Sequence, residues 1–189
     1  MSKRIQPFVA LLRGINVSGR NKVPMADLRR FCGKLGWGDI QTYIQSGNLI
    51  FSAMGPEASL EKELEQLILK RFGLTIPVIV RAGTSWPDYV KGNPFPEASE
   101  TAANAVMMSL PKGAPNKGAV EQIRERAQNG ERIAQVGDAF WIYFKEGVAQ
   151  SKLSPGLLDR VVGSPVTARN WNTVLKIDEM LKQAGKAGV

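Results

Sequence analysis

Ten residues between an apolar run and a helical pattern carry the side chains best suited to binding an anion. Three of them are cationic and could meet phosphate or carboxylate. Two are glycines, which let a ligand approach the backbone closely. A loop between the end of a strand and the start of a helix is a frequent place for anion sites. The residues in question are Arg13, Gly14, Gly19, Arg20 and Lys22.

A purely structural interpretation of this loop stays open beside the functional one. Asn16 and Asn21 suit a loop whose asparagines cap and turn the chain, although Asn16 is also a candidate ligand contact. Pro24 suits the first position of a helix, which predicts Val23 as the N-cap. Since valine offers no side-chain acceptor, the first N–H groups of that helix would be left for an outside partner.

A second group of candidates lies in the segment YIQSGN, which predicts a hairpin turning at Gly47-Asn48. Tyr43 and Gln45 alternate along the expected strand and would share one face, with a stacking ring beside an amide. Together with Ser46 and Asn48 they could shape a pocket. The same residues are also typical of an ordinary hairpin turn without a ligand, so a binding role and a purely structural role both stay open.

The segment Arg169-Asn170-Trp171-Asn172 supplies a fourth cation for the proposed site. Arg169 is expected at the end of a strand, where a guanidinium can hold phosphate or carboxylate through two hydrogen bonds. Asn172 is expected to cap the following helix, and Trp171 is expected in the core.

Charge is concentrated near the amino terminus. The formal net charge is +8, and residues 1–34 hold eight basic side chains against the single acid Asp27. The other 155 residues are almost balanced, with 17 basic and 16 acidic side chains. This basic region could raise the local concentration of an anionic partner, or it could be solvated surface without a function.

Several classes of chemistry are excluded or disfavoured by composition. The chain has no histidine, which removes histidine-dependent catalytic triads and histidine zinc sites. The acids form no DxD-type cluster, so we expect neither a metal site nor a cofactor. Cys32, the one cysteine, lies on the apolar stripe of a predicted helix and is expected in the core. With no signal peptide and no apolar stretch of about 20 residues, we expect a cytoplasmic protein that has no membrane partner.

The order of elements predicts an α+β protein made by tandem duplication. Apolar runs, helical spacing and turn residues give β-α-β-β-α-β in each half, the order of a ferredoxin-like unit. Gly47 and Gly137 lie 90 residues apart in equivalent turns, and Gly73 and Gly163 do so at helix ends. We therefore expect a first half over 1–81, a connection over 82–104 and a second half over 105–189 with an added C-terminal helix.

Particular element boundaries also follow from capping and turn residues. Ser59 is expected to cap the second helix, and Pro77 predicts that the strand near 76–81 begins late or lies at an edge. Trp141 and Tyr143 share the strand face opposite Phe140 and Ile142, where they are either buried between layers or exposed as a stacking platform.

Three long motifs resemble those of a known bacterial family. LLRGINVSGRNKVPM, YIQSGNLIF and RNWNTVLKI are similar to the family catalogued as domain of unknown function 1697. The resemblance spans almost the whole chain and implies a compact protein with two ferredoxin-like halves and no established activity. Ser18 departs from the glycine usual there, which puts a backbone nest at that residue in doubt.

From the sequence we expect a module that binds a phosphate-bearing ligand, either a nucleotide or a stretch of nucleic acid, at the basic loop. Two alternatives stay open: an enzyme acting on a small anionic substrate with Lys22 or Tyr43 as proton carrier, and an adaptor for an acidic protein. Neither the ligand nor the oligomeric state follows from these patterns.

Overall fold

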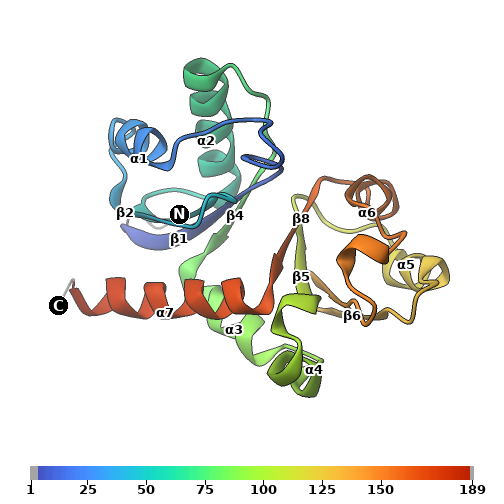
Figure 1. The fold of residues 1–189 in the computed structure, drawn as a ribbon. Helices are drawn as coiled ribbons and strands as arrows, with labels where there is room; N and C mark the ends of the chain where they lie inside the picture. Colours follow the sequence, from blue (N-terminus) through green and yellow to red (C-terminus); the bar gives the residue numbers. More distant parts are fainter. Residues whose placement is uncertain (1–3, 188–189) are drawn as a thin grey trace. The chain divides into compact units, whose positions relative to one another are not determined.

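The computed structural model describes residues 4–187, which form two compact units. The first unit contains the chain up to Pro87 and again from Ile177 onward, and the second contains Asp88–Lys176 (Figure 1). Both units mix helices with a four-stranded antiparallel sheet, so the predicted α+β class is confirmed.

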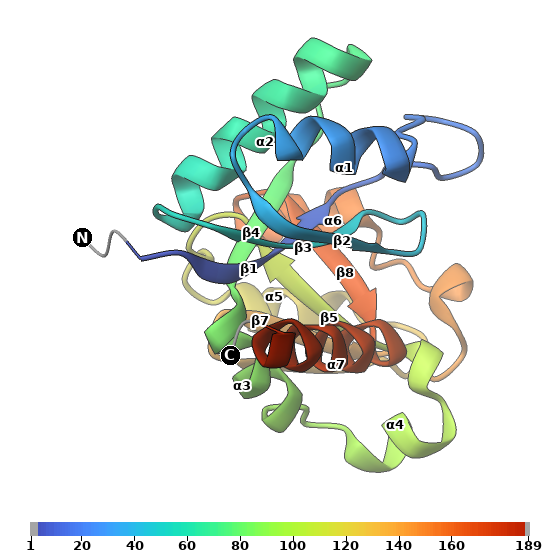
Figure 2. The same cartoon turned by 90° about the vertical axis from the view of Figure 1, so that its left-hand side faces the viewer.

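The first unit follows the order expected from the sequence. Its strands pair in the order β2-β3-β1-β4 with antiparallel neighbours, and two helices lie together on one face (Figure 2). Strand residues that face the helices, such as Phe8, Phe51 and Val80, form one apolar core with them. The elements are β1 (Gln6–Leu12), α1 (Met25–Gly33), β2 (Gly38–Tyr43), β3 (Asn48–Ala53), α2 (Glu57–Phe72) and β4 (Val78–Ala82).

Carboxylates of α2 accept hydrogen bonds from the outer edge of strand β4. Glu57, Glu61 and Glu65 follow one another at four-residue spacing, which places them on one face of the helix. Their Oε1 atoms accept hydrogen bonds from the backbone N–H groups of Ala82 (2.6 Å), Val80 (2.9 Å) and Val78 (2.9 Å), respectively. Each of these N–H groups would otherwise lie unpaired at a sheet edge, so these acids are structural.

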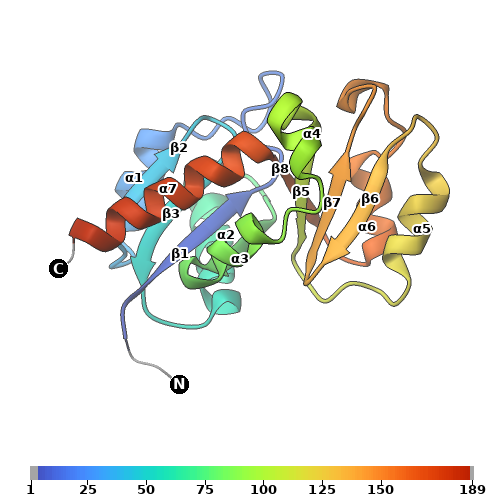
Figure 3. The same cartoon turned by 90° about the horizontal axis from the view of Figure 1, so that it is seen from below.

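The second unit repeats the connectivity of the first. Its sheet has the order β6-β7-β5-β8, element for element the order of the first sheet, and Figure 3 shows α5 and α6 on one side of it. Phe140, Ile142 and Ile123 belong to the apolar core between them. The elements are β5 (Val106–Pro111), α5 (Ala119–Arg126), β6 (Arg132–Val136), β7 (Ala139–Tyr143), η3 (Val148–Gln150), α6 (Pro155–Val162) and β8 (Val166–Asn170).

The stretch expected to connect the halves has structure of its own. It contains η1 (Gly83–Ser85), α3 (Trp86–Lys91), α4 (Pro96–Thr101) and η2 (Ala103–Ala105). The last helix, α7 (Trp171–Ala187), begins in the second unit, but its residues from Ile177 onward belong to the first. Ile177 is buried there, and Leu181 packs against Gly83. This division of the helix differs from the expected second half, 105–189, which contained all of it.

Three predicted caps were wrong, because a neighbouring residue takes the role. Helix α1 has Pro24 as its N-cap, so Val23 lies outside the helix, and α2 has Pro56, so Ser59 lies within the first turn. In α7 the side-chain oxygen of Asn170 accepts the N–H of Thr173 at 2.9 Å, and Asn172 is already helical. The late start and edge position expected from Pro77 are confirmed by β4.

Candidate anion-binding site

The loop after β1 has an unusual backbone. Within ten residues, Gly14, Asn16, Ser18, Gly19 and Asn21 all have positive φ, between 48° and 75°. Asparagine and glycine tolerate this region best, which explains their use here. Ser18 adopts φ 48° although it is a serine, so the departure noted in the sequence does not prevent the left-handed conformation.

Two asparagine side chains hold the loop in shape. The amide of Asn16 donates to the carbonyl oxygens of Gln45 (2.8 Å) and Val23 (3.0 Å), and its oxygen accepts the N–H of Val23 at 2.9 Å. Asn21 donates to the carbonyl oxygen of Gly14 at 2.8 Å. Asn16 therefore ties both ends of the loop to the β2–β3 turn, and its amide is committed to the backbone.

The cations of the loop face solvent. Arg20 and Lys22 are exposed, and in the described part of the chain neither makes an ion pair. Arg13 is half-buried, and its backbone N–H donates to the carbonyl oxygen of Pro77 at 3.1 Å. Gly14 and Gly19 are exposed with open space where a side chain would start, so their positive φ is what requires glycine.

An open recess of about 540 Å³ lies beside this loop, between the first turn of α1 and the β2–β3 turn. Figure 2 shows the loop and that turn at the same end of the first unit. Arg29 reaches into the recess wall and donates to Thr42 Oγ1. The recess is lined by Pro24, Met25, Ala26, Arg29, Thr42, Ile44 and Gln45.

Of these lining residues the sequence analysis proposed only Gln45. Arg29 could have been found from helical spacing, since it lies four residues after Met25 and so on the same face of the first turns. Ile44 carried no signal in the sequence. It has φ 50°, a conformation that a β-branched residue rarely adopts, and the residue is 50% exposed. Strain of this kind concentrates at functional sites.

The turn itself differs from the expected one. Strand β2 ends at Tyr43, which pairs directly with Asn48, so the turn is Ile44–Gly47 and Asn48 begins β3. Tyr43 and Gln45 therefore do not alternate on one strand face. Asn48 is fully buried, and its amide donates to Tyr43 O (3.0 Å) and Ser46 Oγ (3.2 Å), so its side chain holds the turn from the first residue of β3.

Arg169 belongs to the second unit. It is the penultimate residue of β8, is buried, and donates to Thr167 Oγ1 at 2.9 Å and to the carbonyl oxygen of Ala168 at 2.8 Å. Desolvation by burial lowers the pKa of its guanidinium to about 10. Its proposed role with the loop cations stays a prediction.

The remaining candidate residues of the sequence analysis are buried or half-buried. Cys32 is fully buried as expected, and burial raises the pKa of its thiol to about 12. Trp141 is buried and Tyr143 half-buried, which agrees with the packing interpretation of this strand face. Trp171 was expected in the core but is only half-buried, because it begins α7 and packs edge to face against Trp141 with ring centroids 5.8 Å apart.

Within residues 4–187 no group of three or more acidic or cysteine side chains could hold a metal ion. The helices in that range include none long and apolar enough to cross a membrane.

Comparisons with known proteins place the chain in a family. A family model described as Protein of unknown function (DUF1697) matches residues 5–141. The solved structure of the conserved bacterial protein SP0830 from Streptococcus pneumoniae is similar, with a TM-score of 0.72 and 25% sequence identity. That match covers 94% of this chain and 99% of the other. No curated protein matches the chain.

Proposed function

The chain belongs to the DUF1697 family of proteins of unknown function, and we propose that it binds a phosphate-bearing ligand at the loop Arg13–Lys22 and the adjoining recess. The observation that carries this proposal is a loop whose backbone is fixed by side-chain amides, while its cations Arg20 and Lys22 are exposed and make no ion pair within residues 4–187. A preformed loop loses little conformational entropy when it binds.

The recess supports a ligand with more than a phosphate group. Its wall combines the guanidinium of Arg29 with the apolar surfaces of Pro24, Met25 and Ile44. A sugar or base attached to phosphate could contact that apolar surface while the phosphate meets Arg20 and Lys22. The exposed side chain of Ile44 would then be covered by the ligand, which gives a reason for its strained backbone.

A strand of nucleic acid fits the distribution of charge better than a single nucleotide. A second cationic group surrounds the ring of Phe31 toward the other end of α1: Arg30 Cζ at 4.5 Å, Arg71 Cζ at 4.9 Å and Lys34 Nζ at 5.8 Å from the ring centroid. Helix α1 has 9 residues, which at about 1.5 Å each spans roughly 13 Å. Cations at both ends of such a helix suit several phosphates in a row.

The two units are proposed to be ferredoxin-like halves produced by tandem duplication. Support comes from the identical strand order of the two antiparallel sheets and from the matching element order β-α-β-β-α-β in each. On this interpretation the basic loop and its recess are an elaboration of the first half, because the equivalent turn in the second half is two residues shorter.

A thermal-shift panel of nucleotides, sugar phosphates and short oligonucleotides tests the proposal. A ligand present at 100 times its Kd stabilises the protein by about 2.7 kcal/mol, which should raise Tm by roughly 5–11 °C for a protein of this size. The double variant Arg20→Gln/Lys22→Gln should lose that shift while its unliganded stability changes by less than about 1 kcal/mol.

The matched control is Lys117→Gln/Lys145→Gln, which removes the same charge from exposed positions in the second unit. It should keep the shift. A panel without any shift, or equal loss in both double variants, would show that the loop is not the binding site.

A further inference from the structure

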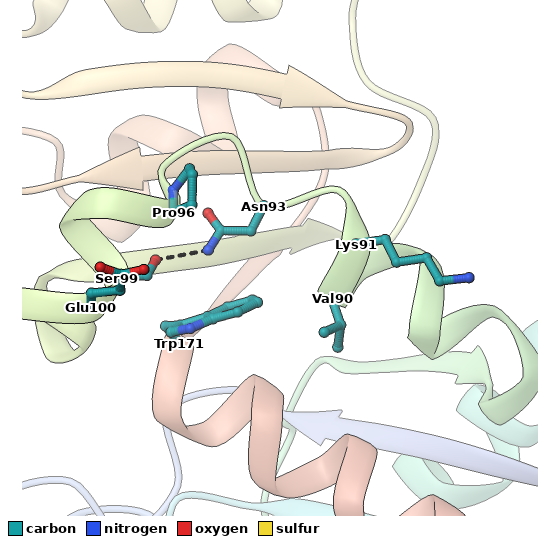
Figure 4. A pocket seen from close by; sticks show the side chains of 7 residues that line it. All are labelled: Val90, Lys91, Asn93, Pro96, Ser99, Glu100 and Trp171. Atoms are coloured by element: carbon teal, nitrogen blue, oxygen red, sulfur yellow. Dashed lines mark hydrogen bonds between the residues drawn. The ribbon is translucent and has the colours of Figure 1, made fainter.

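A second recess, built by the connection between the halves, has a different chemistry. It measures about 470 Å³ and lies wholly within the second unit, between α3, α4 and the first residue of α7. Figure 4 shows the Trp171 ring between the helix that carries Ser99 and the helix that carries Val90. The side chains used below are Val90, Asn93, Pro96, Ser99, Glu100 and Trp171.

The walls of this recess are fixed to the β6–β7 hairpin. Tyr89 Oη donates to Asp138 Oδ1 at 2.9 Å, which anchors α3. Gly92 approaches the hairpin so closely that a Cβ there would lie 3.1 Å from Val136 Cγ1. Phe95 is buried, with Arg132 Cζ 4.9 Å from its ring centroid. The recess is therefore preformed, which lowers the entropic cost of filling it.

Its floor is an aromatic ring held in place. Trp171 is half-buried, and the ring of Trp141 packs against it at an interplanar angle of 60°. Val90 and Pro96 add apolar surface beside it. A half-exposed indole at the bottom of a recess offers a face on which a flat ring can stack.

The polar groups of the recess favour hydrogen-bond donors. Asn93 is oriented by two bonds, from its Nδ2 to Ser99 Oγ (2.7 Å) and from the N–H of Phe95 to its Oδ1 (2.9 Å). Glu100 is exposed and makes no ion pair with any residue that the structure describes. The ammonium group of Lys91 points away from the Trp171 ring (Figure 4). A carboxylate beside a stacking surface attracts N–H groups and repels free phosphate.

We propose that this recess binds a planar nitrogen heterocycle with adjacent N–H donors, stacked on Trp171 and hydrogen-bonded to Glu100. Guanine has this chemistry, because its ring N–H and its exocyclic amine point the same way and can both donate to one carboxylate. The inference does not rest on the basic loop, since it uses other residues and an opposite charge.

Guanosine is the probe, with inosine as the analogue that lacks the exocyclic amine. Trp37, Trp86 and Trp141 are buried, so acrylamide quenching of the native protein reports mainly on Trp171. Guanosine should protect that fluorescence from acrylamide, and calorimetry should show that it binds about tenfold more tightly than inosine.

Substitution of the carboxylate tests the assigned hydrogen bond. Glu100→Gln should weaken guanosine binding about tenfold or more, because a hydrogen bond to a charged group is lost. Glu97→Gln, on the same helix but outside the recess, is the matched control and should bind as the wild type does. Both residues are exposed, and circular dichroism with Tm confirms that each variant is folded.

Three results would overturn the proposal. The first is unprotected Trp171 fluorescence at millimolar guanosine and inosine. The second is guanosine binding that Glu100→Gln leaves unchanged, which would refute the assigned hydrogen bond. The third is equal weakening in Glu100→Gln and Glu97→Gln, which would place the effect in overall charge.

Discussion

Individual side chains of the loop have different structural roles. The amides of Asn16 and Asn21 donate to backbone carbonyl oxygens, whereas Arg20 and Lys22 are exposed and form no ion pair with any described residue. The sequence predicted that both kinds of residue belong to the loop but left open which would build it. The hydrogen bonds show that the asparagine amides help to build the loop. Each asparagine has positive φ, and its side chain holds this backbone conformation by bonding to backbone groups.

A buried thiol gives a prediction for alkaline pH. The pKa of Cys32 is raised by burial from 9.0 to about 12, so above pH 9 the unfolded chain loses a proton that the folded chain keeps. The contribution of this group to stability is therefore complete below pH 9 and falls as pH rises, by about 1.4 kcal/mol at pH 10.

Urea unfolding of wild type and Cys32→Ala at pH 8 and pH 10 measures this effect. The variant is less stable at pH 8 because it leaves a cavity, and the difference between the two proteins should shrink by about 1.4 kcal/mol at pH 10. A difference that stays constant between the two pH values would contradict a buried, protonated thiol.

At the scale of elements, the two hairpins differ in the length of their turns, and the longer turn lines a recess. The β6–β7 turn has two residues, Gly137 and Asp138, whereas the β2–β3 turn has four, Ile44–Gly47. The longer turn carries Ile44 and Gln45 to the recess and receives the amide of Asn16. Its Gly47 lies against the end of β1 and the start of the loop: a Cβ there would lie 2.7 Å from Leu12 Cβ and 2.8 Å from Ile15 Cδ1.

One glycine from each turn allows a comparison of tight and open surroundings. Gly47→Ala should destabilise the protein by more than about 2 kcal/mol, because it combines strain at φ 85° with a steric clash. Gly137→Ala, at φ 60° with open space around it, should cost about 1 kcal/mol. Denaturant unfolding compares the two, and equal losses would show that the turn does not pack tightly on the loop.

The sequence predicted elements better than their ends. Apolar runs located the buried strands, because strand burial leaves a strong pattern, and turn glycines located the mostly exposed strands β2 and β6 through their hairpins. The N-caps of two helices differ from the predicted ones by one and three residues. In α1 the N-cap is Pro24, which was expected at the first helical position, and in α2 it is Pro56 in place of the expected Ser59. Trp171 was misplaced for a related reason: the cap is Asn170, so the tryptophan opens the helix beside a recess.

At the scale of the whole molecule, charge and surface chemistry divide between two recesses. The recess of the first unit adjoins exposed cations, and the recess of the second unit carries an exposed carboxylate beside an indole; within residues 4–187 none of these charges makes an ion pair. Sequence reasoning pointed to the loop beside the first recess through charge, because eight of the first 34 residues are basic, but it proposed only Gln45 among the residues that line this recess. It missed the second, because residues 82–104 contribute only short helices whose position depends on contacts with the β6–β7 hairpin.

The salt dependence of oligonucleotide binding is the most direct measurement of the central claim. A labelled single strand should bind with log Kd rising against log salt, by about 0.7 for each phosphate that a cation neutralises. The account predicts that Arg20→Gln/Lys22→Gln lowers this slope by about 1.4, while Lys117→Gln/Lys145→Gln leaves it unchanged. A slope that is identical in wild type and both double variants would contradict a phosphate contact at the loop.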